Sequence, residues 1–320
     1  MRLFSLHALL TIAALLASGP SLAQQYPTKP IRLVIGFPPG TIIDTVARMV
    51  GTEMEKQLGQ PIVLEFKPGA NGTIAAKYVV SSNPDGYTFY YGNVLLAHPL
   101  FNRNNAVDAA TELSPVSRFV TLPYFLVARS GLPVKSIQDL LAYTKANPGA
   151  LTHGAPTATT DLLMQMLKDR AGIESRSIPY KGSPQILTAL LAGEIDTTIS
   201  SVQAFLPHIQ AGRIRALLVT SPRRSPVLPN VATTVDAGLP NFDMALNFGL
   251  WAPLQTPKEI NQRLSKEVSV VLKNPIIVEQ ILKGSAAEAV GSTPEEQMRS
   301  FEAETRFWSE AIRRANFQPQ

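Results

Sequence analysis

The stretch from residue 31 to residue 50, IRLVIGFPPGTIIDTVARMV, decides the fold because a strand pattern changes there into a helix pattern within a few residues. The apolar run from Ile31 to Ile35 is typical of a short buried strand. From Ile43 onward, apolar residues recur at helical spacing. Between the two patterns, the Pro-Pro-Gly turn excludes helix and supplies a glycine that accepts unusual backbone angles. The stretch therefore predicts a strand, a turn and a helix in direct succession.

The start of this helix is a candidate anion site. Its first turn leaves backbone N–H groups without intrahelical partners, and the helix dipole adds roughly half a positive charge. Both features suit a carboxylate or a phosphate. The alternative is an ordinary strand-turn-helix unit in which Asp44 stabilises the helix start. Both interpretations remain open for this segment alone, since only some such units bind ligands.

The first 23 residues have the pattern of a secretory signal peptide. Arg2 is basic, Leu9 to Ala17 is apolar, and Ser21-Leu22-Ala23 is a small-x-small cleavage site. The apolar part is shorter than the roughly 20 residues of a membrane-spanning helix. We therefore expect cleavage after Ala23 and a periplasmic location. The remaining residues 24–320 predict two lobes, at about 100 to 200 residues per domain.

The composition excludes several classes of function. The chain has no cysteine, which rules out disulfides, thiolate metal sites, a cysteine nucleophile and a lipid-modified cysteine anchor. The net charge of +5 comes from scattered basic residues, without the basic stripe and stacking aromatics of a nucleic-acid site. We expect no nucleic-acid partner, no metal and no cofactor.

Strand and helix patterns alternate along the chain in two series. This alternation predicts an α/β protein of two doubly wound lobes, each with a parallel sheet covered on both faces. The chain is expected to cross between the lobes at residues 115–128 and 241–253. Lobe 1 then contains residues 24–121 plus 248–320, lobe 2 contains residues 122–247, and a ligand cleft lies between them beside a hinge.

Motifs for catalysis are absent from the sequence. It contains no GxSxG, HExxH, GxxxxGK[ST] or GxGxxG. The histidines beyond the signal peptide are His98, His153 and His208, which fall on three different predicted elements. Ordinary polar contacts are their favoured role, and no pair of acidic residues demands acid/base chemistry. The chain is therefore not expected to be an enzyme.

Polar loops at strand ends are better candidates, because ligands of open parallel sheets bind beyond the carboxyl ends of the strands. Three such loops occur: Gly40 to Asp44, Gly92-Asn93, and Gly154 to Asp161, whose sequence is GAPTATTD. The threonines of the third loop offer hydroxyl donors beside a helix start, although helix capping alone is an alternative role for each. Facing each other across a cleft, the first and third loops would hold an anion from both lobes.

Longer segments resemble one family of receptors over essentially the whole of residues 24–320. They are PTKPIRLVIGFPPGTIID, KPGANGTIAAKYVVSSNPDGYTFYYGN, IPYKGSPQILTALLAGEID, LPHIQAGRIRALLVTSPRRSPVLPNVATTVDAGLP and the C-terminal TPEE. These segments resemble the periplasmic solute receptors of tripartite tricarboxylate transporters, the Bug family. The resemblance implies a type II periplasmic binding-protein fold without catalysis, which delivers an organic anion to a membrane permease. It also implies that the loops Gly40 to Asp44 and Ala155 to Thr160 grip a ligand carboxylate.

Departures from the family pattern bear on specificity. Thr41 replaces a second glycine, and GAPTATT replaces a glycine-rich loop. β-Branched residues resist positive φ, so we hypothesise that threonine hydroxyls partly replace backbone donors. Ile42 and Ile43 are expected to make the mouth of the site apolar. The expected ligand is an aliphatic or aromatic mono- or dicarboxylate rather than citrate.

Most candidate ligand-binding residues come from these loops. Tyr180 of the PYKG turn and Ser200 at a strand end are added as wall residues of the second lobe. Their alternative roles are loop packing and helix capping. The full set of candidates is Gly40, Thr41, Ile42, Asp44, Asn93, Ala155, Thr157, Thr159, Thr160, Tyr180 and Ser200. The favoured function is a monomeric carboxylate receptor for a permease. A secreted enzyme on the same scaffold and a carboxylate sensor that partners a membrane kinase are the alternatives.

Overall fold

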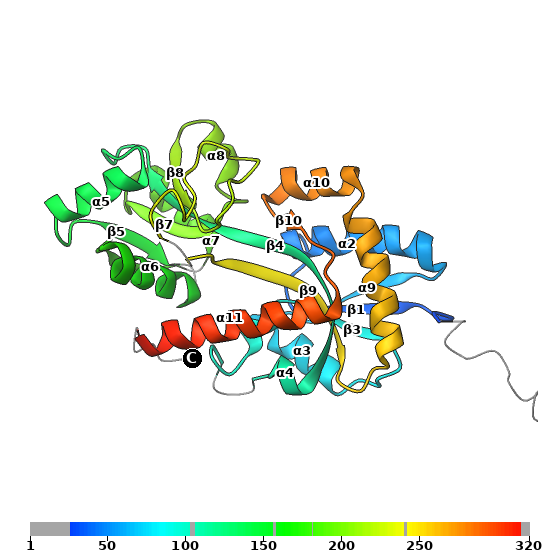
Figure 1. Cartoon of the computed structure of the whole chain (residues 1–320). Coiled ribbons are helices and arrows are strands. Elements are labelled where there is room, and N and C mark those ends of the chain that lie inside the picture. Colours follow the sequence, from blue (N-terminus) through cyan, green and yellow to red (C-terminus); the bar gives the residue numbers. More distant parts are fainter. Residues whose placement is uncertain (1–25, 103–105, 156–157, 181, 240–241, 315–320) are drawn as a thin grey trace, which may run out of the picture.

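A computed structural model describes residues 26–102, 106–155, 158–180, 182–239 and 242–314. The predicted signal peptide and Thr157 lie outside these ranges. The described chain is an α/β protein elongated along two crossing strands, as Figure 1 shows. Within it, no helix combines the length and the apolar character needed to cross a membrane.

The first group of strands is parallel and begins with the stretch that opened the sequence analysis. β1 (Ile31–Ile35) pairs with β2 (Ile62–Phe66) on one side and β3 (Thr88–Gly92) on the other. The predicted helix follows as α2 (Ile42–Leu58), and α3 (Thr73–Val80) connects β2 to β3. The predicted strand-turn-helix unit is therefore confirmed.

A second parallel group lies at the other end of the molecule. It consists of β5 (Thr152–Ala155), β6 (Arg176–Pro179) and β7 (Thr197–Ser201), with β5 between the other two. Its helices are α5 (Ile137–Ala146), α6 (Ala158–Ala171), α7 (Ser183–Ala192) and α8 (Leu206–Gln210), and β8 (Ile214–Val219) pairs antiparallel with a crossing strand. Helix α8 has Pro207 in its first turn, where a proline is tolerated.

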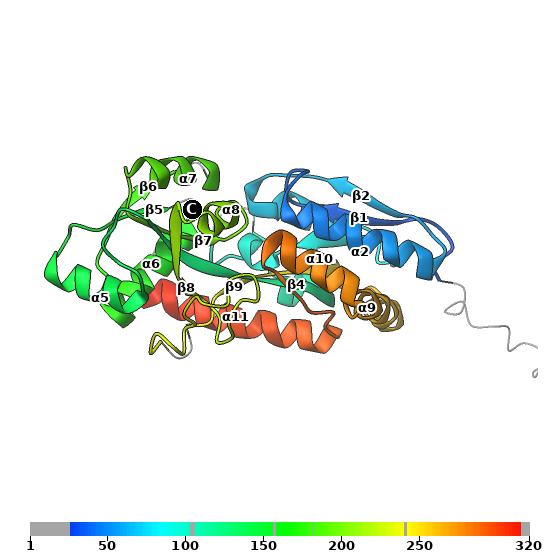
Figure 2. The same cartoon turned by 90° about the horizontal axis from the view of Figure 1, so that it is seen from above.

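Two long strands join the groups. β4 (Leu113–Arg129) and β9 (Ala245–Pro253) are antiparallel neighbours, and the strand order is β2-β1-β3-β9-β4-β7-β5-β6. Figure 2 shows the two groups at opposite ends of this pair. Since β4 alone pairs with both β9 and β7, the sheet is continuous from one end of the molecule to the other.

The register makes the carboxyl ends of both groups point toward the middle of β4. β3 ends at Gly92, opposite Gly249 of β9, which in turn lies opposite Arg118 of β4. β7 runs the other way and ends at Ser201, opposite Tyr124. The six residue steps of β4 from Arg118 to Tyr124 span about 20 Å, at about 3.3 Å per residue. Loops that follow the two groups thus converge on one stretch of the crossing strands.

The last segments of the chain close the fold. α4 (Ala109–Glu112) precedes β4, and after β9 come α9 (Lys258–Leu272), α10 (Pro275–Ser285), the short strand β10 (Glu288–Ala289) and α11 (Pro294–Arg314). β10 pairs with β4, and α11 runs along both groups in Figure 1. A capping box starts α11: Glu296 N–H donates to Thr293 Oγ1 and Thr293 N–H donates to Glu296.

Three apolar cores hold these layers. One contains the β1–α2 side chains and α9, for example Leu33, Val46 and Leu264, all fully buried. A second joins α3, α6 and α11 and includes Tyr90, Leu163 and Trp308. The third packs α7 and α8 against β4 and β8. Because α11 contributes to the same core as α3 and α6, it ties the two groups together on one face.

Candidate functional site

The turn after β1 begins with a close approach of two backbones. A Cβ added to Gly36 would lie 2.5 Å from the Cα of Gly72, at the start of α3, so only glycine fits there. The next residue, Phe37, packs edge-on against Phe248 of β9, with ring centroids 6.1 Å apart. The turn is thereby held against a crossing strand, at the converging end of the first group.

Gly40 and Asp44 build the start of α2. Gly40 has φ +82°, a conformation that favours glycine, and its N–H donates to Asp44 Oδ2 at 2.8 Å. The first intrahelical hydrogen bond runs from Thr45 N–H to the Thr41 carbonyl, so the N–H groups of residues 42–44 have no intrahelical partner. Asp44 therefore stabilises the turn, as expected for an ordinary strand-turn-helix unit. The three backbone N–H groups of residues 42–44 remain as further donors at the helix start.

The carboxylate of Asp44 is buried but balanced. Its side chain is 8% exposed, and Arg48 Nε lies 2.7 Å from Asp44 Oδ1. The two groups form an ion pair but not a hydrogen bond, because the N–H of Arg48 is not directed at the oxygen. Arg48 itself is 58% exposed. An arginine stays charged at every ordinary pH, so the negative charge of Asp44 has a permanent counter-charge.

Thr41 occupies its position without backbone strain. Its φ of −81° and ψ of 165° are extended, so the family's glycine is not needed here for a positive φ. Its hydroxyl donates to the Pro38 carbonyl at 3.1 Å. That proton is used within the turn, which argues against the hypothesis that the Thr41 hydroxyl acts as a ligand donor.

The two isoleucines at this helix start point in different directions. Ile43 is 6% exposed and belongs to the core formed with β1 and α9. Ile42 is half-buried and packs only at the edge of that core. The expectation that both line the mouth of the site was wrong for Ile43, because the helical phase turns its side chain toward the sheet.

In the second group, the matching loop leads from β5 into α6. Ala155 ends β5, and its carbonyl accepts the N–H of Tyr180 at 3.0 Å. Thr159 and Thr160 lie buried in the first turn of α6. Among described non-glycine residues, φ is positive only at Ala70, Asn71 and Ala286, so the loss of glycines causes no such strain at these threonines.

A histidine and an aspartate hold this helix start against the strand. His153 of β5 is buried, and its Nε2 lies 2.9 Å from Asp161 Oδ1 in the first turn of α6. Its Nδ1 lies 2.9 Å from Ser175 Oγ. The hydrogen bond from His153 lowers the pKa of Asp161, and a hydrogen bond from Ser177 acts in the same direction. Asp161 is therefore an ionised carboxylate.

The remaining candidates have mixed surroundings. Ser200 is buried in β7, and its hydroxyl lies 3.3 Å from that of Ser183 at the start of α7. Tyr180 is half-buried against the core under α7. Asn93 caps the short 3-10 turn Val94–Ala97 by accepting the N–H of Leu95 at 2.9 Å, and its buried Nδ2 makes no hydrogen bond. Asn93 lines a small cavity beside Arg118.

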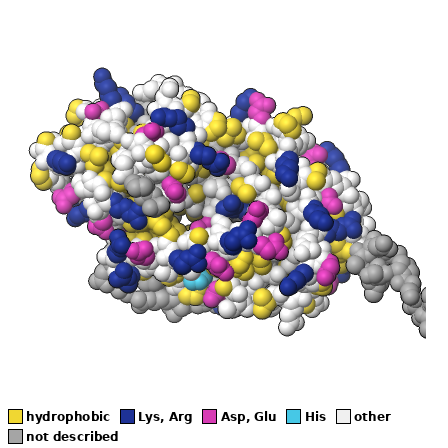
Figure 3. Space-filling model, in the orientation of Figure 1, with side chains coloured by type: hydrophobic (Ala, Val, Ile, Leu, Met, Phe, Trp, Pro, Cys, Tyr) yellow, Lys and Arg dark blue, Asp and Glu magenta, His cyan; other side chains and the backbone are white. Residues whose placement is uncertain are grey.

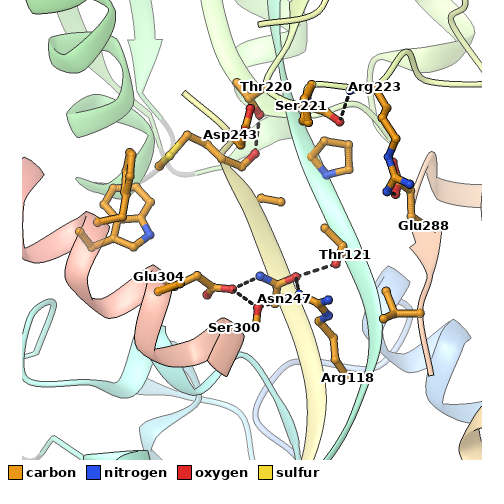
Figure 4. Close-up of a pocket in the computed structure, with 18 of the residues that line it drawn as sticks. Arg118, Thr121, Thr220, Ser221, Arg223, Asp243, Asn247, Glu288, Ser300 and Glu304 are labelled. Carbon is orange, nitrogen blue, oxygen red and sulfur yellow. Dashed lines mark hydrogen bonds and ion pairs between the residues drawn. The ribbon is translucent and has the colours of Figure 1, made fainter. Parts of the chain in front are cut away.

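A larger cavity of about 660 Å³ lies beside the crossing strands, against α11 (Figure 4). It is lined by residues of both crossing strands, of the segment after β8, of β10 and of α11. Figure 3 views the same side of the molecule, where positive and negative side chains are interspersed. We refer to this space as the hinge cavity.

Polar groups of the hinge cavity largely satisfy one another. Arg118 donates to Asn247 at 3.3 Å and to Ser300 at 2.7 Å, and Asn247 donates to Glu304 (Figure 4). Arg223 forms an ion pair with Glu288 across the cavity's edge. Burial raises the pKa of Glu304 to about 8, with Arg118 opposing the shift. Because these groups pair internally, the hinge cavity fits an organic anion less well than the two helix starts.

Sequence reasoning missed the residues that balance charge in these places. Arg48 follows Asp44 by four residues, a helical spacing that could have revealed the pair. His153 and Asp161 are brought together only by the packing of α6 on β5. Glu304, Asn247 and Arg118 come from three distant segments, so no local pattern signals their network.

Two parallel groups, joined by crossing strands and ending in facing loops with helix starts, define a two-lobed periplasmic binding protein of type II. The chain belongs to the tripartite tricarboxylate transporter receptor family, whose model matches residues 46–317. The sequence is 32% identical to a UPF0065 protein of Bordetella pertussis over 100% of both chains. It is also 32% identical to BugT of the same organism, over 92% of each chain. The predicted Bug-family resemblance is therefore confirmed.

Solved structures agree with this assignment. A protein of R. palustris solved with adipate has a TM-score of 0.79 and 32% identity, covering 92% of this chain and 100% of that one. MatC from Rhodopseudomonas palustris with bound malate has a TM-score of 0.73 and 27% identity, covering 90% and 100%. The fold predicted from the sequence is thus confirmed, and the family consists of periplasmic solute-binding receptors.

Proposed function

We propose that this protein captures a small organic carboxylate between its two lobes in the periplasm and passes it, unchanged, to the membrane permease of a tripartite tricarboxylate transporter. One observation carries the proposal: the carboxyl ends of both parallel groups converge on the same stretch of β4. Ligands of such sheets bind beyond those ends. The lobes are residues 24–121 plus 248–320 and residues 122–247, and the cleavable signal peptide is residues 1–23.

The proposed contacts are those of the two helix starts. The N–H groups of Ile42 to Asp44 face the anion from lobe 1, and the first turn of α6, with Thr159 and Thr160, faces it from lobe 2. Ala155, Thr157, Tyr180 and Ser200 complete the wall of lobe 2. Donors at two helix N-termini suit a ligand carboxylate without requiring a basic side chain.

We propose an aliphatic or aromatic mono- or dicarboxylate as the ligand class. Relatives at 32% and 27% identity were solved with adipate and malate, which supports a carboxylate with a short carbon chain. Ile42, half-buried at the helix start, offers apolar contact to such a chain. Isothermal titration of the protein from residue 24 onward against adipate, malate, benzoate and citrate tests the class. Citrate binding far more tightly than the other three would contradict it.

Binding is proposed to shift the lobes from an open to a closed arrangement. Only the closed arrangement lets both helix starts contact one anion, which supplies the differential affinity that such a shift requires. Small-angle scattering should show a smaller radius of gyration with saturating ligand. An unchanged profile would argue against closure.

Receptor and enzyme differ in what happens to the ligand. A receptor is stabilised by the carboxylate through mass action and releases the same compound. Mass spectrometry after long incubation should therefore recover the ligand intact, and a product peak would favour the enzyme. Sedimentation is expected to show a monomer, and co-purification with the permease rather than with a membrane kinase would separate transport from sensing.

A further inference from the structure

Both helices that start at the proposed site carry an aspartate in their first turn. These residues are Asp44 in α2 and Asp161 in α6. An acidic side chain stabilises its own helix, because it interacts with the positive end of the dipole. The same charge repels an anion bound at that end. The affinity for a carboxylate therefore depends on how well each aspartate is balanced by a partner.

The two partners differ in chemistry. Asp44 is paired with Arg48, whose guanidinium keeps its charge, whereas Asp161 is paired with His153 at 2.9 Å. An imidazole changes its charge between about pH 5 and pH 8. The side chain of His153 is 4% exposed, so water and salt screen its interaction with Asp161 only weakly.

Groups that face His153 from the neighbouring strands do not titrate in this range. Ser177 lies opposite His153 in β6, and Thr197 lies opposite it in β7. Ser175 lies at its other ring nitrogen. Helix α7, with the sequence SPQILTALLA, brings no titratable side chain to this sheet.

Nearby charged residues already have partners of their own. Asp196, next to Thr197 in β7, forms an ion pair with Arg129 at 2.8 Å. Glu174, before β6, lies 3.5 Å from Lys168 of α6. Asp161 is the carboxylate to which His153 is hydrogen bonded, so the charge of His153 acts mainly on Asp161.

We propose that His153 is a positioning residue that also tunes carboxylate affinity. When His153 is protonated it neutralises Asp161, and the start of α6 attracts the ligand more strongly. When His153 is neutral, Asp161 keeps its hydrogen bonds but has no opposing charge, so it repels the ligand, most strongly a dicarboxylate. This inference rests on the proposed function. It implies that the pH dependence of binding originates in lobe 2.

Titration calorimetry with adipate, or with malate if adipate does not bind, tests the inference. Between pH 6 and pH 8.5 a free carboxylic acid is largely ionised, since its pKa is near about 4.3. We expect the Kd to rise about five-fold across this range. Runs in buffers of different ionisation enthalpy should show proton uptake on binding.

Two substitutions should shift the affinity for adipate in opposite directions. A purely structural role of the His153–Asp161 pair would not produce opposite shifts. Asp161→Asn removes the repelling charge, so binding should become independent of pH and at least as tight as the wild type at pH 6. His153→Gln keeps a hydrogen-bond donor but never charges, so binding should become independent of pH and as weak as the wild type at pH 8.5. Circular dichroism confirms that each variant is folded.

His98→Asn is the matched control. His98 lies 3.7 Å from Asp108 and does not pair with Asp161, so the wild-type pH dependence should persist. The inference is overturned if adipate binds the wild type equally well at all pH values, or if folded His153→Gln keeps the wild-type dependence. Failure of every tested carboxylate to bind at any pH would overturn the proposed function itself, and this inference with it.

Discussion

The start of α2 and the start of α6 have the same plan but different support. Each follows a parallel strand at the converging ends of the sheet, and each has an aspartate in its first turn. In lobe 1 the aspartate is tied to Gly40 and Arg48 of its own turn and helix. In lobe 2 it is tied to His153 of the underlying strand. The aspartate of lobe 1 thus has a guanidinium as its partner, whereas the aspartate of lobe 2 has an imidazole.

Glu304 in the hinge cavity is a third acidic residue with which the two aspartates can be compared. Its hydrogen-bond partners, Asn247 and Ser300, are neutral, and burial raises its pKa to about 8 even though Arg118 is nearby. Burial therefore outweighs the nearby partners in setting the ionisation of Glu304. The following experiments challenge this comparison, in order of expected effect.

The largest expected difference is in the free energy of unfolding lost when Gly36 and Gly154, one in each lobe, are replaced by alanine. Gly36→Ala should lower the free energy of unfolding by about 3 kcal/mol, because the new Cβ meets the backbone of Gly72 at 2.5 Å. Gly154→Ala should cost about 1 kcal/mol, because its Cβ meets the end of the Ile195 side chain, which can move. Urea unfolding followed by circular dichroism measures both. Equal losses would show that the two turns are equally rigid.

Glu304→Gln should change the pH dependence of stability. The folded pKa of about 8 exceeds the ordinary value of 4.5, so the folded state keeps a proton that the unfolded state releases. Stability contributed by this proton is present below pH 4.5 and falls as the pH rises to about 8. The variant should lack this fall and gain about 1 to 2 kcal/mol at pH 9, less than the full shift implies because the side chain borders a cavity.

The exposed Glu302 of the same helix is the control for Glu304. Glu302→Gln should leave the pH profile of urea unfolding unchanged, because its side chain remains in solvent. A fall in stability that persists in Glu304→Gln would assign the effect to another group.

Arg48→Gln should weaken carboxylate binding about three-fold at every pH from 6 to 8.5, because it removes the permanent counter-charge of Asp44 from a largely exposed ion pair. Calorimetry with adipate measures the change. Lys56→Gln, at the far end of α2, serves as the control. A strong pH dependence of the Arg48→Gln effect would contradict a permanent counter-charge of Asp44.

Thr41→Val should have the smallest effect. The hydroxyl donates within the turn, so its removal should change the Kd for adipate by less than about two-fold. Stability should fall by about 1 kcal/mol or less. A ten-fold loss of affinity would restore the idea that the threonine hydroxyl contacts the ligand.

Patterns of local origin could be predicted from the sequence. The period change at the Pro-Pro-Gly turn located β1 and α2. Contacts that depend on packing could not. No spacing rule brings His153 to Asp161, and the inward orientation of Ile43 depends on the rotation of α2 over the sheet. The two loops proposed to bind the carboxylate were chosen because they follow the carboxyl ends of parallel strands. Their contacts with a ligand remain a prediction.

The strand order also has a consequence for biogenesis. β3 lies beside β9, with Tyr90 opposite Trp251, so the first three strands emerge from the ribosome long before the strand that covers their open edge. An uncovered edge invites pairing with other chains. Assembly of the first three strands must therefore await the last quarter of the chain. A chain truncated before residue 245 should aggregate during export rather than accumulate as a partly folded receptor.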